Sequence, residues 1–209
     1  MNVTRQFAPV LRRLMARPMA MRRSQFAELP KAPDRVVFLG DSITEGGLWD
    51  EWFADLPTLN RGIGGDTVGG MLERLDSSVH APRAVSLLIG TNDLAGLGRS
   101  HRVDDIARQI DTLLSSIRVI APDAPLLVHG VMPRSKSLAD EIQQLNVRIE
   151  QLAAQHSAEF IDLWPALVGP DRTLRKDLTG DGVHLNGAGY RTWIDILRPH
   201  LAPFGTSAP

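Results

Sequence analysis

Short apolar runs alternate with longer segments of helical periodicity along most of the chain. We expect β-strands at five of these runs: 36–39, 58–60, 85–89, 126–131 and 159–163. Apolar residues recur every three to four positions in the segments that we expect to be helices: 68–75, 103–120, 138–156 and 186–197. Strands that alternate with amphipathic helices favour a parallel sheet covered on both faces. We therefore predict a three-layer α/β domain with a parallel sheet of about five strands.

The first 33 residues differ from the rest in charge. Residues 1–35 contain eight Lys and Arg against only Glu28 and Asp34. Pro30 and Pro33 end the helical pattern, since proline lacks an amide and restricts the residue before it. We expect a basic amphipathic helix within 1–33 that packs on a single domain spanning 34–209, with its arginines solvated. The alternative is a helix that lies on a membrane surface or serves as a targeting peptide.

Composition narrows the functional classes. The chain has 209 residues, a formal net charge of −1 and no cysteine, which excludes disulfides, thiolate nucleophiles and cysteine-based zinc sites. A net charge close to zero gives no reason to expect nucleic acid as a partner. No apolar run approaches the roughly 18 residues that cross a bilayer, so we expect no stable membrane insertion. We expect a cytoplasmic protein, with peripheral membrane contact through the basic helix left open.

Glycine-rich and polar stretches follow the first three predicted strands. They are 40–43 (Gly-Asp-Ser-Ile), 62–66 (Gly-Ile-Gly-Gly-Asp) and 90–93 (Gly-Thr-Asn-Asp). Ligands of open α/β sheets bind beyond the carboxyl ends of the strands. One edge of the sheet is therefore expected to gather a hydroxyl, a glycine loop and an amide.

A fourth stretch supplies acid–base chemistry. Asp181 and His184 stand three residues apart before the last predicted helix, a spacing at which the carboxylate can fix the tautomer of the ring. If the fold brings Ser42 within about 3 Å of the other ring nitrogen, its hydroxyl becomes a nucleophile. The backbone amides of Ser42 and Gly65 and the side-chain amide of Asn92 are candidate donors to an oxyanion. Separately, each residue has a structural alternative as a helix cap, turn former or loop brace.

In this order, the four stretches resemble the conserved blocks of the GDSL/SGNH hydrolase family. Ile43 replaces the leucine of the family name, which is a conservative change. The segment 60–67 (Asn-Arg-Gly-Ile-Gly-Gly-Asp-Thr) is most similar to the platelet-activating-factor acetylhydrolase catalytic-subunit branch and related bacterial esterases. The resemblance runs from about Asp34 to Tyr190. It implies a flavodoxin-like fold, no cofactor, a Ser42-His184-Asp181 triad and an oxyanion hole from Ser42, Gly65 and Asn92, and the related subunits imply a homodimer.

Other residues near the expected site are assigned from their place in the sequence. We assign Trp49, Met132, Arg134 and Val183 to substrate binding; for Trp49 the alternative is packing of a helix on the sheet. Asp41 and Asp66 are expected to hold loop amides. The remaining histidines lack metal-ligand spacing, and we predict no metal site.

The functional hypothesis is a serine esterase that hydrolyses small carboxylic esters through an acyl-enzyme on Ser42. Two alternatives use the same site: an acyltransferase, and an O-deacetylase acting on sugars or lipids. A third is a non-catalytic binding module, against which the intact Ser42, His184 and Asp181 argue. The sequence does not identify the substrate.

Overall fold

The protein is a three-layer α/β domain, described by a computed structural model over residues 6–205. Five parallel strands form one sheet in the order β2-β1-β3-β4-β5. Their bounds are β1 Val36–Gly40, β2 Thr58–Gly62, β3 Ala84–Leu88, β4 Leu126–His129 and β5 Glu159–Ile161. This is the flavodoxin-like strand order, which reverses direction between β1 and β3. The predicted fold class is confirmed, and each observed strand overlaps the predicted one.

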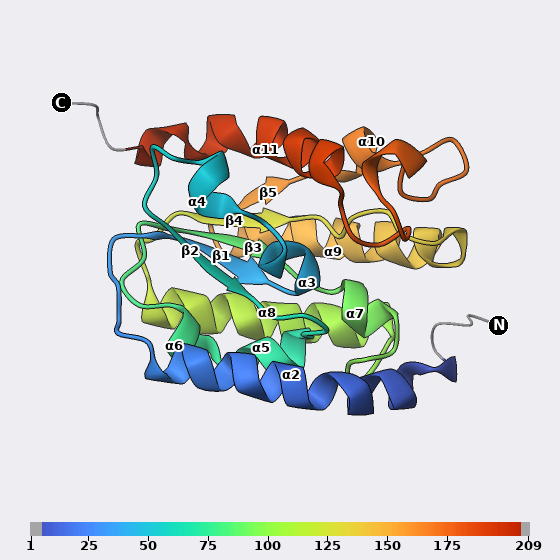
Figure 1. The fold of residues 1–209 in the computed structure, drawn as a ribbon, viewed down its shortest axis with the longest axis horizontal. Coiled ribbons are helices and arrows are strands. Elements are labelled where there is room, and N and C mark those ends of the chain that lie inside the picture. The colour runs from blue at the N-terminus through green and yellow to red at the C-terminus, as the bar shows by residue number, and fades with distance from the viewer. Residues whose placement is uncertain (1–5, 206–209) are drawn as a thin grey trace.

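Helices cover both faces of the sheet (Figure 1). One apolar core joins the sheet to α5, α6, α8 and α9, and a second core joins its other face to α4, α10 and α11. The helix bounds are α3 Ser42–Glu45, α4 Trp49–Trp52, α5 Val68–Leu72, α6 Leu75–Ser78, α7 Thr91–Leu94, α8 Val103–Ile120, α9 Ala139–Gln155, α10 Trp164–Leu167 and α11 Gly187–Leu201, with short 3-10 turns at Lys136–Leu138, Lys176–Leu178 and Ala202–Phe204. Strands that are buried on both faces explain why β1 and β3 consist almost entirely of buried residues.

Two helical predictions need correction. The single helix expected over 68–75 is two short helices, α5 and α6, with a break at Arg74 whose guanidinium is buried and bound to other groups. The last helix continues past Pro199 to Leu201 rather than ending near Leu197. The caps behave as expected: Thr67 accepts the amide of Gly70, and Asn186 accepts those of Ala188 and Gly189.

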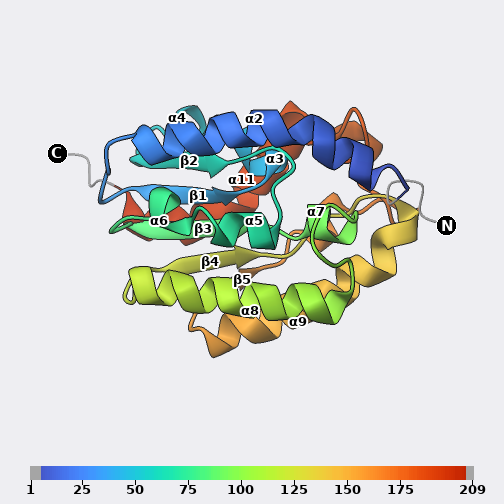
Figure 2. The same cartoon turned by 90° about the horizontal axis from the view of Figure 1, so that it is seen from below.

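The N-terminal helix α2 (Ala8–Glu28) lies against the domain and runs past the carboxyl ends of the strands (Figures 1 and 2). Phe26 is buried, with the guanidinium groups of Arg22, Arg61 and Arg74 over its ring. Arg12 is exposed, as expected, although it also donates to the carbonyl oxygen of Gly96. The expectation of solvated arginines is wrong for Arg22 and Arg23, which are half-buried and pair with carboxylates of the domain. Residues 1–5 of the predicted N-terminal segment and 206–209 of the predicted domain lie outside the described residues.

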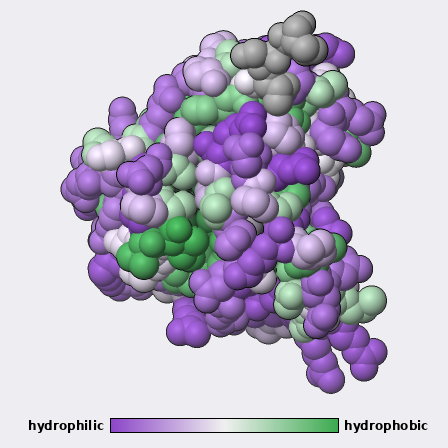
Figure 3. Space-filling model, turned by 90° about the vertical axis from the view of Figure 1, so that its left-hand side faces the viewer, coloured by the Kyte–Doolittle hydropathy of each residue, from purple (hydrophilic) through white to green (hydrophobic). Residues whose placement is uncertain are grey.

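The opposite end of the molecule, where the strands begin, is largely hydrophilic with one compact hydrophobic patch (Figure 3). Among residues 6–205, no helix combines the length and the apolar character needed to span a bilayer. The polar and glycine-rich loops singled out from the sequence all lie at the other end, beyond the carboxyl ends of the strands.

Candidate active site

Ser42 is the first residue of α3, immediately after β1. Asp41 caps this helix through its side chain, which accepts the amide of Ile43 at 3.0 Å. A Cβ on Gly40 would lie 2.0 Å from the Thr44 hydroxyl oxygen, so the turn from strand to helix needs glycine there. The Tyr190 hydroxyl donates to the carbonyl oxygen of Ile43 at 2.6 Å and fixes the turn from the α11 side. The Ser42 side chain is thereby held half-buried at the sheet edge.

His184 and Asp181 lie in the loop before α11, and His184 contacts Ser42 from there. Ser42 Oγ lies 2.9 Å from His184 Nε2, and His184 Nδ1 lies 2.6 Å from Asp181 Oδ2. Asp181 Oδ1 also accepts the backbone amides of Val183 and His184 at 2.9 and 2.8 Å. The three-residue spacing thus lets one carboxylate bind both the backbone of the loop and the ring of His184.

The charge of Asp181 is stabilised by this geometry. Partial burial opposes ionisation, but hydrogen bonds from the His184 ring and from the amides of His184 and Val183 outweigh it and hold the pKa of the carboxyl well below its usual range. The carboxylate favours the tautomer of His184 that carries its proton on Nδ1, and in this tautomer Nε2 can take the hydroxyl proton of Ser42.

Gly65 and Asn92 lie beyond the carboxyl ends of β2 and β3. Gly65 has a φ of 77°, a left-handed conformation that favours glycine. Within residues 6–205 its amide donates to no acceptor. Asn92 lies in α7 and donates one Nδ2 hydrogen to the carbonyl oxygen of Asp66 at 2.9 Å. Because the amide carries two hydrogens, Asn92 both braces the glycine loop and keeps a donor.

Arg74 holds the glycine loop, residues 62–66, in place through hydrogen bonds. The sequence did not predict this role. The buried guanidinium of Arg74 donates to Asp66 at 2.7 Å, to the Ser78 hydroxyl at 2.9 Å and to the carbonyl oxygen of Gly40 at 3.0 Å. It therefore joins the end of β1 to the loop after β2. The sequence predicted that the side chain of Asp66 holds loop amides. This prediction is wrong, because that side chain binds Arg74 and Arg23 instead. An isolated arginine at residue 74 gives no motif by which it could have been recognised.

Two more carboxyl groups are fully buried beside the site. Burial raises the pKa of Asp41 to about 7, and it raises the pKa of Asp93 to about 7 as well. Each keeps one oxygen without a hydrogen-bond partner: Oδ2 of Asp41 and Oδ1 of Asp93. An unpaired buried oxygen favours the protonated acid over the carboxylate.

The four residues assigned to substrate binding divide into two pairs. Trp49 and Met132 belong to the second core and are 1% and 3% exposed; the Trp49 ring stacks on Phe38 with centroids 4.0 Å apart. The expectation that they border the substrate is therefore wrong, since packing against β1 buries them. Arg134 and Val183 line a hollow of about 640 Å³ that also includes Asp181. Arg134 donates to the carbonyl and hydroxyl oxygens of Thr91, both at 3.3 Å.

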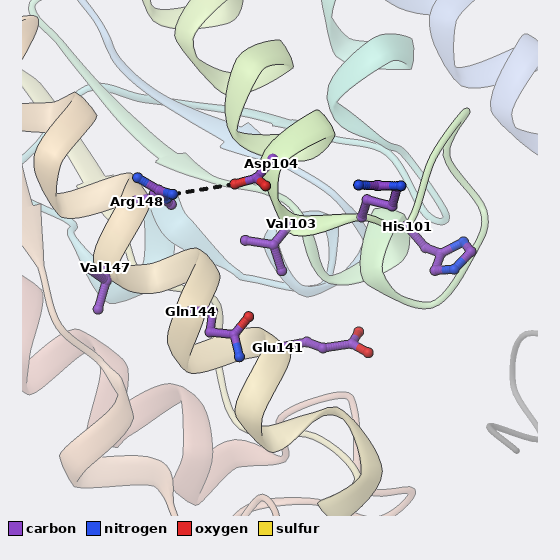
Figure 4. Close-up of a pocket in the computed structure, with 8 residues that line it drawn as sticks. His101, Val103, Asp104, Glu141, Gln144, Val147 and Arg148 are labelled. Carbon is purple, nitrogen blue, oxygen red and sulfur yellow. Dashed lines mark hydrogen bonds and ion pairs between the residues drawn. The ribbon is translucent and has the colours of Figure 1, made fainter.

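Other polar groups lie apart from this centre. Burial lowers the pKa of His129 to about 3, so its ring is neutral, and it lies 2.8 Å from the Ser86 hydroxyl. A hollow of about 630 Å³ lies between the start of α8 and α9 (Figure 4), where Asp104 pairs with Arg148 at 3.4 Å. No triad residue lines it. In the described part of the chain, no group of three His, Asp or Glu side chains is placed to hold a metal ion.

Comparisons with known proteins identify the family of the chain. Residues 38–192 match the model of the GDSL-like Lipase/Acylhydrolase family. Platelet-activating factor acetylhydrolase IB subunit alpha1 of Rattus norvegicus is 32% identical over 171 residues, which cover 77% of this chain and 71% of the relative.

Two solved structures extend the likeness to the fold. A GDSL-like lipase from Bacteroides thetaiotaomicron is 26% identical with a TM-score of 0.75, covering 88% of this chain and 97% of that one. A protein of Streptococcus pneumonia, proposed to be a platelet activating factor, is 26% identical with a TM-score of 0.81, covering 92% and 97%. The family model spans most of the sheet and all four polar stretches. The chain therefore belongs to the GDSL-like lipase/acylhydrolase family and is a hydrolase of the esterase type.

Proposed function

We propose that the protein hydrolyses small carboxylic esters through an acyl-enzyme on Ser42. The observation that carries this proposal is the continuous chain of contacts from Ser42 Oγ to His184 Nε2 at 2.9 Å and from His184 Nδ1 to Asp181 at 2.6 Å. A serine hydroxyl is a weak nucleophile unless a base removes its proton. The aligned ring supplies that base, and the carboxylate orients the ring and stabilises its charged form.

In the first half of the reaction, Ser42 Oγ attacks the carbonyl carbon while His184 Nε2 takes the hydroxyl proton. The oxyanion of the tetrahedral intermediate accepts hydrogen bonds from the amides of Ser42 and Gly65 and from Asn92. His184 then gives its proton to the leaving alcohol, and the acyl group stays on Ser42. A water molecule repeats these steps and releases the acid, which restores the free hydroxyl and the neutral ring.

The openness of the site supports hydrolysis over transfer to another alcohol. The side chains of His184 and Asp181 are 50% and 55% exposed, so water reaches the ring that activates it. An acyltransferase has to keep water away from the acyl-enzyme while its acceptor binds. The ratio of transferred to hydrolysed product in the presence of added alcohols tests this choice, and an excess of transfer product at millimolar alcohol would contradict hydrolysis.

Substitution of the two reacting residues tests the proposal. Ser42→Ala and His184→Ala should each lower kcat for p-nitrophenyl acetate by at least about 10⁴-fold, because these residues act as one unit. His200→Ala is a matched control: His200 also pairs with a carboxylate, Glu159 at 2.7 Å, but outside the site. The control should keep its rate, and the melting temperature should show that all three variants fold. Wild-type rates in either Ser42→Ala or His184→Ala would refute the assignment.

A further inference from the structure

Helix α2 approaches the glycine loop of the site although it lies outside the residues matched by the family model. The side chain of Met15 rests on Gly65: a Cβ placed on this glycine would lie 3.0 Å from Met15 Cε. A Cβ placed on Gly64 would lie 3.4 Å from Met15 Cε and 3.9 Å from the Cβ of Ser42. Met15 and the nucleophile thus approach the same point from two sides.

This part of α2 is fixed to the domain rather than projecting freely. Arg12 donates to the carbonyl oxygen of Gly96 at 2.8 Å and also to that of Gly98, in the loop after α7. About three turns further along the helix, Arg22 pairs with Glu45 and Arg23 with Asp66. Glu45 in turn accepts the amide of Gly64 at 2.8 Å. The residues between these anchors therefore keep a defined orientation toward the site.

The contacts also show which side of α2 faces Ser42. Helical residues advance by about 100°, so Arg22 and Leu11 lie about 20° and 40° to one side of Met15. Arg12 and Arg23 lie about 60° and 80° to the other side. Arg22 contacts Glu45 of α3, the helix that begins at Ser42. Leu11 and Arg22 therefore lie on the same side of Met15, the side that the Arg22–Glu45 pair turns toward α3.

That side of the helix carries an exposed apolar stripe. Leu11 is 38% exposed and Leu14 is 68% exposed. Three more exposed apolar residues lie four or seven positions from one of these leucines and so share their side of the helix: Phe7, Val10 and Met21. Contiguous exposed apolar surface beside a site marks a place where an apolar group binds. Met15, one helical turn from Leu11, connects this stripe to the glycine loop beside Ser42.

We propose that Leu11, Leu14 and Met15 of α2 form the surface on which the acyl chain of the substrate lies. The inference rests on the proposed function. Because His184 protonates the leaving alcohol, that oxygen has to face the ring. The carbonyl oxygen faces Gly65 and Asn92, so the acyl chain leaves the reacting carbon on the side away from His184. Helix α2 borders that side, because it packs on α6 at the opposite face of the sheet from α11.

An apolar acyl surface favours chains longer than acetyl. Each methylene fully removed from water strengthens binding by roughly fourfold. An open surface covers the chain only partly, so four added methylenes are expected to give the hexanoyl ester about a tenfold advantage from this contact. The site therefore takes medium-chain acyl esters at least as well as acetyl esters.

The test is the ratio of kcat/KM for p-nitrophenyl hexanoate to kcat/KM for p-nitrophenyl acetate, from which the fraction of active enzyme cancels. The wild type should give a ratio of one or more, and Leu11→Ser/Leu14→Ser should lower it by about tenfold. Val119→Ser/Val147→Ser is the matched control: both residues are exposed valines, on α8 and α9. The control should keep the wild-type ratio within twofold.

Three outcomes would overturn the inference. One is a wild type that hydrolyses acetate but has a ratio far below one. Another is a ratio in Leu11→Ser/Leu14→Ser that equals that of the wild type. If the ratio is unchanged and this variant changes from dimer to monomer in gel filtration, the stripe is instead an interface between two copies of the chain. The third outcome concerns the proposed function itself. Failure of the wild type to hydrolyse either ester would refute the proposed function, and this inference with it.

Discussion

At the scale of single residues, the site depends on one carboxylate that does two things. Asp181 binds the His184 ring through one oxygen and two backbone amides through the other. An asparagine keeps an acceptor for the amides but no longer fixes the ring tautomer that leaves Nε2 unprotonated. Asp181→Asn should therefore lower kcat by about 10³- to 10⁴-fold while the loop stays folded. The pre-steady-state rate of acylation checks this; a loss below tenfold would remove Asp181 from the mechanism. Asp140→Asn, at an exposed ion pair with Arg172, is the control.

The three residues Ser42, His184 and Asp181 could be singled out from the sequence because each lies in a short local pattern after a strand or before a helix. Arg74 could not, since its partners Asp66 and Gly40 come together only when β1 and β2 pair. Trp49 was misplaced for a related reason. A tryptophan shortly after a nucleophile suggests a pocket, but this ring is covered by Phe38 and Trp193, which are distant in sequence.

At the scale of elements, α2 is attached mainly through Phe26. This side chain is 3% exposed and lies beneath three guanidinium groups. Phe26→Ala should lower the free energy of unfolding by about 3 kcal/mol, because it removes buried apolar area and leaves a cavity. Urea unfolding measures the change. Phe7→Ala, at a 61% exposed position of the same helix, should change stability by less than about 0.5 kcal/mol. Equal effects of the two substitutions would show that Phe26 does not anchor the helix.

The long elements were the most predictable. Helix α8 spans the residues expected from its apolar periodicity, and α9 differs by one residue at each end. The four-residue helices α3, α4, α7 and α10 were missed, because one turn is too short for any periodicity to appear. Three of them follow strands, α3 after β1, α7 after β3 and α10 after β5, and the chain direction there depends on packing. The direction taken by α2 was equally hidden, since apolar residues occur on both its buried and its exposed sides.

At the scale of the whole molecule, the buried acids make stability depend on pH. Asp93 has a pKa of about 7 in the folded protein against 3.8 as its ordinary value. Between these values the folded state holds a proton that the unfolded state has released, so this group stabilises the fold at acid pH and the contribution is lost as pH rises through 7. Asp93→Asn should flatten the dependence: from pH 5 to pH 8 the wild type should lose about 2 kcal/mol more than the variant. Parallel stability curves from urea unfolding would contradict this.

The account as a whole depends on residues 142 positions apart meeting at one edge of the sheet, so that His184 activates Ser42. The most direct test is reaction with a fluorophosphonate, followed by mass spectrometry of the digested protein. We expect one label per chain, on Ser42, with labelling reduced by at least about 100-fold in His184→Ala, because the hydroxyl reacts only when its proton is taken. Labelling of a different serine, or a rate on Ser42 that does not change when His184 is removed, would contradict the account.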